Sequence, residues 1–369
     1  MQTPDAPQRA MGMPPGTAAT LDALPPEQPT GPRWQVPAAD FRALALGPVL
    51  CELADHGVIT LSGADAVSFL QAQTSADIAA MGASTWQPGG YCTPKGRLLA
   101  IFEAWRGLPD TQGNADLHLL LPAELAAETA RRLAMYVLRA KVKLRVASEE
   151  WSVLGVCGTG AARALGHAGL ALPAADWECL PLSTGDGARI ARLPASAACP
   201  ERYLLVLPRA ALPAWRERLA GVADLRGASA ALWRWSQVQA ALPAIFASTR
   251  ECFVPQTVNL EVLGGVNFRK GCYPGQEIVA RSQYLGKLRR RMALAHAAAL
   301  GPGADIFQGD PPQAVGRIVM AASAPQGGWD LLFECPSDVH ERGSLHAGAA
   351  DAPALRLQPL PYVLFDPTA

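Results

Sequence analysis

Short apolar, β-branched runs alternate with segments of helical period along most of the chain. Residues 57–61 (GVITL) predict a strand, and residues 64–72 (ADAVSFLQA) predict a helix with one apolar face. The stretch YCTPKGRLLAIFEAW predicts a β-hairpin, because Pro94 and Gly96 suit the second and fourth positions of a tight turn. We expect the second strand of this hairpin over residues 98–105.

Two segments further along have the same pattern. Residues 116–133 and 202–219 align without gaps, and each is a short apolar strand, a proline and a helix. The match indicates either a duplicated subdomain or chance similarity between two ordinary strand–helix units. Duplication predicts two similar α+β halves built on antiparallel sheets.

The two ends of the chain differ from this middle region. Residues 1–33 contain eight prolines and few large apolar side chains, so they cannot bury enough surface to offset their ordering entropy. We expect a disordered tail there. After about residue 295, short runs broken by proline and glycine, such as VGRIVMAA and WDLLFECP, predict a small β-barrel or sandwich.

The composition narrows the class of protein. The 369 residues are 50% hydrophobic and carry 32 basic and 32 acidic side chains, so sizeable cores are possible and a strongly basic nucleic-acid coat is excluded. Neither a membrane span of about 20 apolar residues nor a secretory signal is evident. The eight cysteines include no CxxC pair. We therefore expect a cytoplasmic protein, without a membrane partner and without direct nucleic-acid binding.

Several familiar catalytic motifs are missing. The chain has no P-loop, no HExxH, no GxSxG and no Cys/His spacing typical of metal ligands, so we expect neither a hydrolase, an oxidoreductase nor a metal site. The run from Gly155 to Gly160 resembles a dinucleotide fingerprint, but Arg163 stands where that motif needs Gly or Ala. We interpret it as a strand-to-helix turn.

The most informative segment is KGCYPGQE, residues 270–277. Gly271 allows the backbone to approach a ligand closely, and Pro274-Gly275 predicts a turn that leads into a helix at Glu277. Cys272 lies two residues from Lys270 and just before the expected helix start, and both features favour the thiolate. An isolated cysteine would be interpreted as a small buried residue; in this octapeptide we interpret Cys272 as a reactive thiol and Lys270 as the charge that tunes it.

This octapeptide, preceded by PQTVNLEVLGGVNF and followed by IVAR, resembles the signature of the YgfZ family of folate-binding proteins. That family is related to the T-protein, the aminomethyltransferase of the glycine cleavage system. The segments GVITLSGADAVSFLQAQTSAD, YCTPKGR and VGRIVM extend the resemblance from about Gly57 to the C-terminal region. It implies an α+β fold: two ferredoxin-like α+β lobes over residues 34–292 and a C-terminal β-barrel over residues 293–369, arranged around a central folate site.

The resemblance also implies a function. Its members act in folate-dependent assembly, maintenance or repair of iron–sulfur cluster proteins, including enzymes that thiomethylate tRNA. We therefore expect tetrahydrofolate or a derivative as cofactor and iron–sulfur client proteins as partners. Cys272 matches the cysteine on which family function depends. Lys95, in the hairpin turn, and Arg281, after the motif, are expected to bind the acidic end of the folate, and the expected cofactor-binding residues are Lys95, Gln239, Tyr273, Gly275, Gln276, Glu277 and Arg281.

The chain departs from the T-protein pattern at two positions. A T-protein would carry an acidic residue shortly after Gly96, but residues 97–101 (RLLAI) contain none, so proton transfer at the folate nitrogen lacks its usual agent. Gln239 stands where T-proteins have a glutamate that binds the pterin, and an amide can still donate and accept there. Two alternatives remain: a folate-dependent aminomethyl transferase that uses another acid, and a non-catalytic scaffold with a vestigial folate site.

Overall fold

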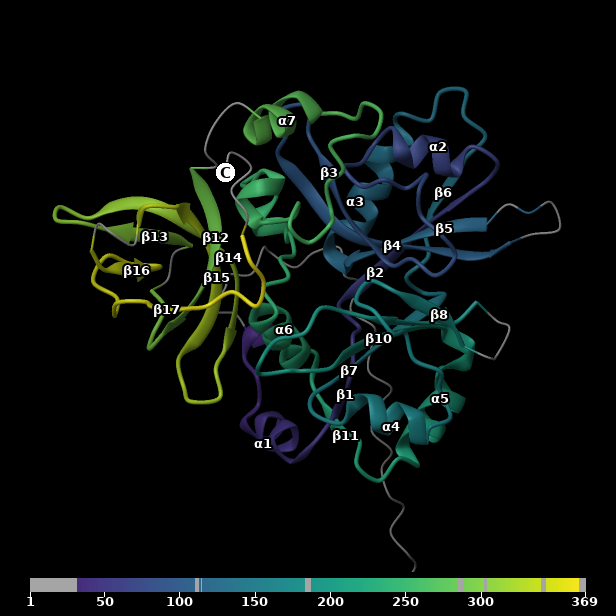
Figure 1. Ribbon diagram of the computed structural model, residues 1–369, viewed down its shortest axis with the longest axis horizontal. Coiled ribbons are helices and arrows are strands. Elements are labelled where there is room, and N and C mark those ends of the chain that lie inside the picture. Colours follow the sequence, from purple (N-terminus) through teal and green to yellow (C-terminus); the bar gives the residue numbers. More distant parts are fainter. Residues whose placement is uncertain are drawn as a thin grey trace, which may run out of the picture.

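The computed structural model describes residues 32–109, 113, 115–182, 187–284, 289–301, 304–339 and 343–364 of the chain. Within these residues the strands form three sheets, and helices or loops pack beside each sheet (Figure 1). The α+β class predicted from the sequence is confirmed. All but the last two residues of the predicted tail, 1–33, lie outside the described part of the chain.

The first sheet is antiparallel throughout and has the strand order β3-β4-β5-β2-β6. Its strand β2 and helix α2 are the strand and helix predicted at residues 57–61 and 64–72, and β3 and β4 are the predicted hairpin. The hairpin turn closes with a hydrogen bond of 2.9 Å from the Gly96 amide to the Thr93 carbonyl. The elements of this unit are β2 (His56–Ser62), α2 (Ala66–Gln71), β3 (Gln87–Cys92), β4 (Leu98–Pro109), β5 (Ala115–Pro122), α3 (Ala123–Ala134) and β6 (Lys143–Val146).

The second sheet has the order β11-β1-β7-β10-β9-β8, in which only the edge pair β11 and β1 is parallel among the strands described. Helix α6 packs very closely on β7: a Cβ atom on Gly155 would lie 2.4 Å from the ring of Trp233. Its helices and strands are η2 (Pro32–Trp34), α1 (Ala38–Leu46), β1 (Val49–Glu52), β7 (Trp151–Cys157), α4 (Ala161–His167), β8 (Cys179–Pro181), β9 (Arg189–Arg192), β10 (Arg202–Pro208), η3 (Arg209–Ala211), α5 (Leu212–Ala220), β11 (Arg226–Ala228) and α6 (Ala230–Gln239).

The internal repeat corresponds to one unit in each of these sheets. In the first copy β5 ends at Pro122 and leads into α3; in the second, β10 ends at Pro208 and leads through η3 into α5. Both strands lie inside their sheets rather than at an edge. The two halves predicted from the repeat are therefore present as strand–helix units on two separate sheets.

The third sheet, in the order β16-β13-β14-β15-β12-β17, curves into a half-barrel (Figure 1). It starts at Arg290, just before the predicted start of the C-terminal unit at residue 293. Residues 240–284 connect it to α6 and contain two short 3₁₀ turns and the last helix. These elements are η4 (Ala247–Thr249), η5 (Pro255–Val258), α7 (Gln276–Tyr284), β12 (Arg290–Ala297), β13 (Asp305–Gln308), β14 (Gln313–Ser323), β15 (Trp329–Pro336), β16 (Leu345–Ala347) and β17 (Arg356–Gln358).

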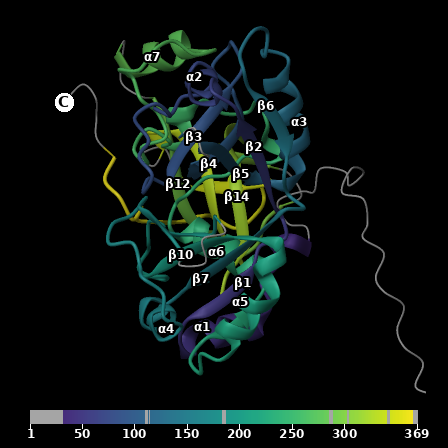
Figure 2. The same cartoon turned by 90° about the vertical axis from the view of Figure 1, so that its right-hand side faces the viewer.

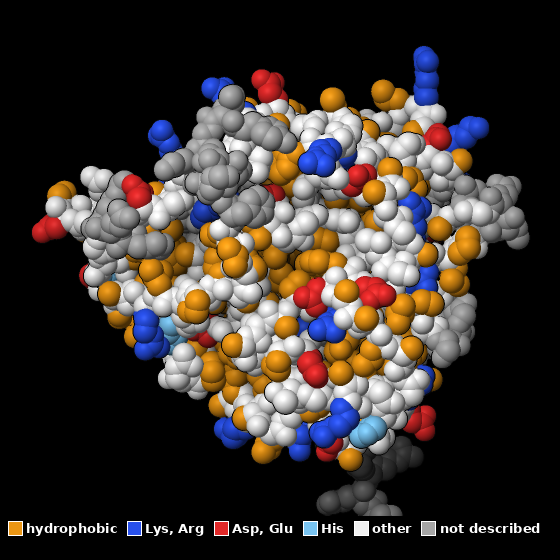
Figure 3. All heavy atoms as spheres, viewed as in Figure 1, with side chains coloured by type: hydrophobic (Ala, Val, Ile, Leu, Met, Phe, Trp, Pro, Cys, Tyr) orange, Lys and Arg blue, Asp and Glu red, His pale blue; other side chains and the backbone are white. Residues whose placement is uncertain are grey.

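The three units meet around a central region. The first sheet lies above the second, and β12 and β14 of the third sheet pass behind them (Figure 2). The Trp86 amide donates a hydrogen bond of 2.9 Å to the Trp177 carbonyl, which ties the first unit to the second. Hydrophobic side chains gather at the middle of the face shown in Figure 3. Between the units, a small apolar cluster comprises Ala240, Leu242 and Leu263, with Trp177 and Tyr362 packed against it.

Within the residues described, no helix is both long and apolar enough to cross a membrane.

Candidate functional site

The signature loop at residues 270–275 packs directly on the hairpin turn of the first sheet. Gly275 has a φ of +82°, and a Cβ atom there would lie 2.4 Å from the Thr93 carbonyl oxygen and 2.7 Å from the Gly96 nitrogen. Gly96 has a φ of +71°, and its Cβ would lie 3.0 Å from the Cβ of Ile278. Both positions thus require glycine for conformation and for space. The approach of a ligand to the backbone at Gly271 stays a prediction; the close contact within the protein is that of Gly275 with the hairpin turn.

Lys270 anchors the same loop to the segment that follows α2. Its ammonium donates to the carbonyl oxygens of Gln71, Thr74 and Ala76, the last at 2.9 Å. It also lies 5.1 Å from the centroid of the Tyr273 ring. Burial lowers the pKa of Lys270 to about 8, an effect that the charge of Asp77 opposes, and the three carbonyl dipoles further favour the charged form. All three N–H donors are therefore engaged in holding the loop.

Asn267 supports this anchor; it lies in the segment that precedes the signature, but nothing in that segment singles it out. Its side-chain oxygen accepts hydrogen bonds from the amides of Arg269, at 2.7 Å, and Lys270, at 3.1 Å. Its amide group donates to Asp77 at 3.0 Å, and its backbone N–H donates to Ser75 at 2.9 Å. Both the side chain and the backbone of Asn267 therefore hold the loop before the signature in place.

Cys272 is the exposed member of the eight cysteines; Cys252 is partly buried and the other six are buried. It lies at the rim of a cavity of about 510 Å³. The walls are mostly small or apolar side chains from α2 and its flanking loops, together with Gly271: Ala64, Val67, Ala72 and Ala79. A thiol in this position is accessible to a reactant that enters the cavity.

Cys92, at the end of β3, has a different environment. It is only 2% exposed, and burial raises its pKa to about 12. Its neighbour in the site is Tyr273, whose own pKa is raised by burial and by the charge of Cys92. Cys92 is therefore a buried thiol beneath the signature loop, whereas Cys272 faces solvent.

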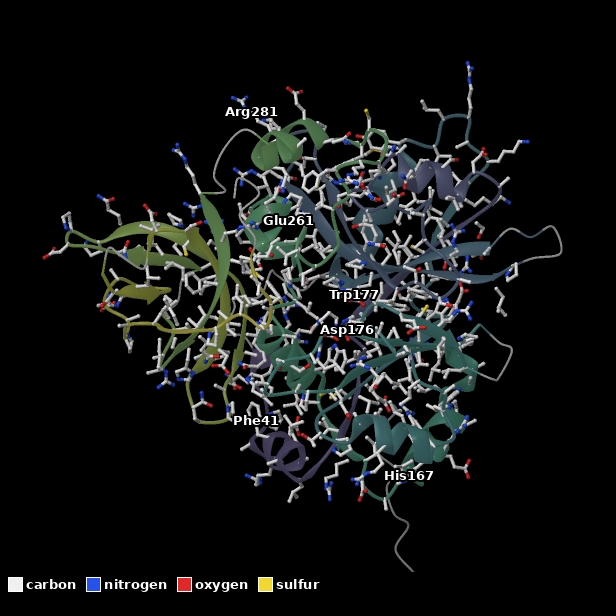
Figure 4. All side chains as sticks on the ribbon, viewed as in Figure 1. Phe41, His167, Asp176, Trp177, Glu261 and Arg281 are labelled. Atoms are coloured by element: carbon white, nitrogen blue, oxygen red, sulfur yellow. The ribbon has the colours of Figure 1, made fainter. Side chains whose placement is uncertain are left out.

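The other signature residues divide between the core and the surface. Tyr273 is 6% exposed, and its hydroxyl has no hydrogen-bond partner within the described part of the chain. The helix expected after the turn begins at Gln276, whose amide donates to the Tyr273 carbonyl at 3.1 Å. Gln276 is half-buried, Glu277 is exposed, and Arg281 is exposed on the outer side of α7 (Figure 4).

Lys95 is exposed on the hairpin turn against which this helix packs. The structure therefore brings together the predicted residues Lys95, Lys270, Cys272, Tyr273, Gly275, Gln276, Glu277 and Arg281, on one loop, one helix and one turn. Their roles toward a ligand stay predictions.

Gln239 belongs to a different cluster, at the end of α6. Its amide donates to Asp330 of β15 at 2.9 Å, and the Trp235 indole donates to the same carboxylate oxygen at 2.8 Å. The other oxygen of Asp330 lies 2.9 Å from Nδ1 of His296. Asp330 is 2% exposed, so this carboxylate needs these partners. In this structure the Gln239 amide nitrogen holds the half-barrel against α6.

The turn that would carry the T-protein acid has basic and apolar residues instead. The Arg97 guanidinium donates to the Cys252 carbonyl at 2.6 Å. The nearest carboxylate along β4 is Glu103, which accepts a hydrogen bond of 2.6 Å from the Trp86 indole and whose pKa is raised by burial. Among the described residues, no group of three or more His, Cys, Asp or Glu side chains could hold a metal ion.

The arrangement of the sheets defines the class of protein: the chain has the fold of aminomethyltransferase T. The glycine cleavage system aminomethyltransferase T from Bartonella henselae superposes with a TM-score of 0.69 at 17% identity, over 87% of this chain and 89% of its own. At this identity the likeness shows the fold alone. No family model matches the chain.

Sequence relatives define the family more closely. The tRNA-modifying protein YgfZ of Enterobacter sp. (strain 638) is 32% identical over 349 residues, which cover 93% of this chain and 99% of that protein. The tRNA-modifying protein YgfZ of Sodalis glossinidius (strain morsitans) is 28% identical over 346 residues, 91% of this chain and 98% of its own. The chain belongs to the YgfZ family, as its signature octapeptide indicated.

Proposed function

We propose that this protein binds a reduced folate and uses the exposed thiol of Cys272 to support the assembly, maintenance or repair of iron–sulfur cluster proteins, including tRNA-thiomethylating enzymes. The observation that carries the proposal is the packing of the signature loop on the hairpin turn, which leaves Cys272 at the rim of a cavity. The name of its relatives, tRNA-modifying protein, supports the link to tRNA.

Folate would fit the polar and apolar groups that the central region offers. The side chains of Glu261 and Gln283 each carry a buried oxygen with no hydrogen-bond partner among the residues that the structure describes. Buried acceptors of this kind suit a ligand with N–H donors. When bound, a tetrahydrofolate would supply a carrier for one-carbon units, and the protein would supply the fixed walls around it.

In this proposal Lys270 is a positioning residue, because its three donors hold the loop that presents the thiol. Cys272 is the group that contacts the client or its sulfur-containing substrate. Lys95 and Arg281, both exposed near the loop, supply positive charge for the glutamate tail of the folate. We place the protein in the cytoplasm, where its clients would be made.

The transferase alternative lacks an acid at the expected place. Arg97 occupies the turn and is bonded to a backbone carbonyl, and Glu103 is bonded to Trp86 away from the turn. The scaffold alternative makes no use of an exposed thiol at a cavity, or of unpartnered buried acceptors. We therefore favour the folate-dependent role with Cys272 as its reactive group.

The experiment is complementation of a bacterial strain that lacks its own YgfZ-family gene, with thiomethylated tRNA measured by mass spectrometry. The wild type should restore the modification, and Cys272→Ala should leave it at the level of the deletion strain. Cys252→Ala is the matched control, because Cys252 is a partly exposed thiol outside the cavity. Full restoration by Cys272→Ala would refute the thiol role.

A further inference from the structure

The end of α3, the loop that follows it and the edge strand β6 form a surface with exposed apolar side chains, which we call the α3–β6 surface (residues 131–146). It contributes four of the nine large hydrophobic side chains that are exposed in the described part of the chain. Leu138 is 88% exposed, and the other three are Met135, Tyr136 and Val146. Exposed apolar side chains that gather in one segment mark interaction sites, whereas scattered single ones are ordinary.

The backbone that carries Leu138 is anchored to the protein. Val137 and Ala140 pack against the main hydrophobic core, and Val142 is buried within it. Because these neighbours face inward, the segment is already ordered while Leu138 and Arg139 face solvent. A pre-ordered segment of this kind loses little conformational entropy when a partner binds to it.

The same surface is strongly basic. Residues 131–145 contain six basic and no acidic residues. Three of the six are arginines that pair with Glu128 or Glu150. The other three, Arg139, Lys141 and Lys143, lie between them in the sequence and are exposed. Figure 3 shows Lys and Arg side chains at the upper right of the molecule, the corner that α2 and β6 occupy in Figure 1. A surface of this charge attracts an acidic partner.

The α3–β6 surface adjoins the cavity at Cys272. The Lys141 amide donates a hydrogen bond of 2.6 Å to the Asp65 carboxylate, and the Asp65 amide donates one of 3.2 Å to the Lys141 carbonyl. Asp65 stands at the start of α2, and its neighbour Ala64 and the first turn of α2 line the cavity whose rim carries Cys272. A partner that covers the α3–β6 surface therefore reaches the mouth of this cavity.

We propose that the α3–β6 surface docks a protein partner with an acidic, partly apolar face, and that this docking places the partner over the cavity at Cys272. The inference rests on the proposed function, which makes an iron–sulfur client protein the partner. A phosphate backbone would use the three exposed bases but not the apolar side chains of Met135, Leu138 and Val146. Protein interfaces, by contrast, are enriched in Met, aromatic residues and Arg. The combination of groups thus favours a protein over a nucleic acid.

The test measures binding of the full-length protein to a purified tRNA-thiomethylating enzyme, the client of the proposed function, by biolayer interferometry at low and at high salt. The charge variant is Arg139→Ala/Lys141→Ala/Lys143→Ala, and the apolar variant is Leu138→Ala. Leu46→Ala, at an exposed leucine that ends α1, is the control for the apolar variant. The control for the charge variant removes three exposed arginines of α1, α4 and α5, at the opposite end of the molecule (Figure 1): Arg42→Ala/Arg163→Ala/Arg216→Ala. Thermal unfolding checks that each variant is folded.

Wild type should bind the enzyme less tightly as the salt concentration rises, because salt screens the attraction between opposite charges. The charge variant should slow association and weaken binding at low salt by about tenfold or more. Leu138→Ala should mainly speed dissociation, by about tenfold, because it removes apolar area that the partner buries. Both controls should bind within about twofold of wild type, since their positions lie far from the docked partner.

If wild type binds the enzyme and the two surface variants bind as tightly as their controls, the inference is wrong, and the proposed function still stands on the thiomethylation that depends on Cys272. Failure of wild type to bind, while it restores thiomethylation through Cys272, has the same meaning. If wild type neither binds the enzyme nor restores thiomethylation, the inference and the proposed function both fail. Surface variants that lose binding to unmodified tRNA or to anionic lipid vesicles, and not to the enzyme, would assign the surface to another class of partner and refute the inference.

Discussion

Replacing Gly275 by alanine should destabilise the contact on which the candidate site depends. The backbone there has a φ of +82°, and the left-handed region costs a non-glycine residue about 1–2 kcal/mol. The added Cβ would lie 2.4 Å from the Thr93 carbonyl oxygen and 2.7 Å from the Gly96 nitrogen. These are backbone atoms that no side-chain rotation can move away, so overpacking adds roughly 1–3 kcal/mol. We expect a total loss of about 2–5 kcal/mol in the free energy of unfolding.

Gly271→Ala is the matched control within the same octapeptide. No atom lies within 4 Å of a Cβ at Gly271, so this substitution should change stability by less than about 0.5 kcal/mol. Urea unfolding followed by tryptophan fluorescence gives both values, and hydrogen exchange reports locally on the amides of Gln276 and Val279, which bond to Tyr273 and Gly275. Equal stabilities for Gly275→Ala and wild type, or equal losses for the two variants, would refute this packing.

Three further predictions test other parts of the structure. Burial lowers the pKa of His118 to about 3, below its unfolded value of about 6.5, so the unfolded chain binds the proton first and stability is lost as the pH falls through this window. Urea unfolding at several pH values gives the change in the free energy of unfolding per pH unit. His118→Gln should reduce this pH dependence by up to about 1.4 kcal/mol per pH unit, and an unchanged pH dependence would contradict the prediction. Gly155→Ala should lower the free energy of unfolding by about 1–3 kcal/mol, because the Trp233 ring lies against this position. Gly166→Ala, at an open helical position, should raise it by up to about 1 kcal/mol. Thermal unfolding that ranks the two variants in the opposite order would disprove the packing of α6 on β7. A thiol reagent applied to the native protein should label Cys272 first, and peptide mass spectrometry that finds a buried cysteine labelled sooner would argue against the exposed site.

Local signals in the sequence predicted local structure well. The strand at β2, the helix α2 and the turn from Thr93 to Gly96 follow from apolar period and from turn chemistry, both of which involve neighbouring residues. The two strand–proline–helix units and the β-rich C-terminal region could be predicted for the same reason. The signature octapeptide was sufficient to identify the family. The helix that follows it begins at Gln276, one residue before the predicted position.

The contacts of the candidate site were harder to predict because they join distant segments. Lys270 was assigned to tune Cys272, but its donors are directed to backbone carbonyls of Gln71, Thr74 and Ala76, and any residue type carries a carbonyl there. Likewise, nothing in the sequence around Gln239 indicates that its partner would be Asp330, on a strand of the half-barrel.

Glu261 shows the same difficulty. It lies in the segment that precedes the signature, but nothing in that segment indicates that its side chain is buried or that it pairs with Arg291. Each of these properties arises only when the loop, α7 and β12 are assembled. The helix α7 could be predicted from the sequence, whereas these contacts between distant segments could not.

The most direct test of the central claim is calorimetric titration of tetrahydrofolate into the wild type and into Cys272→Ala. Because Cys272 lies at the rim of its own cavity and is exposed, the account predicts that both proteins bind with the same affinity, and that the thiol acts after binding. Absence of binding to the wild type would contradict the folate-dependent role and favour a scaffold.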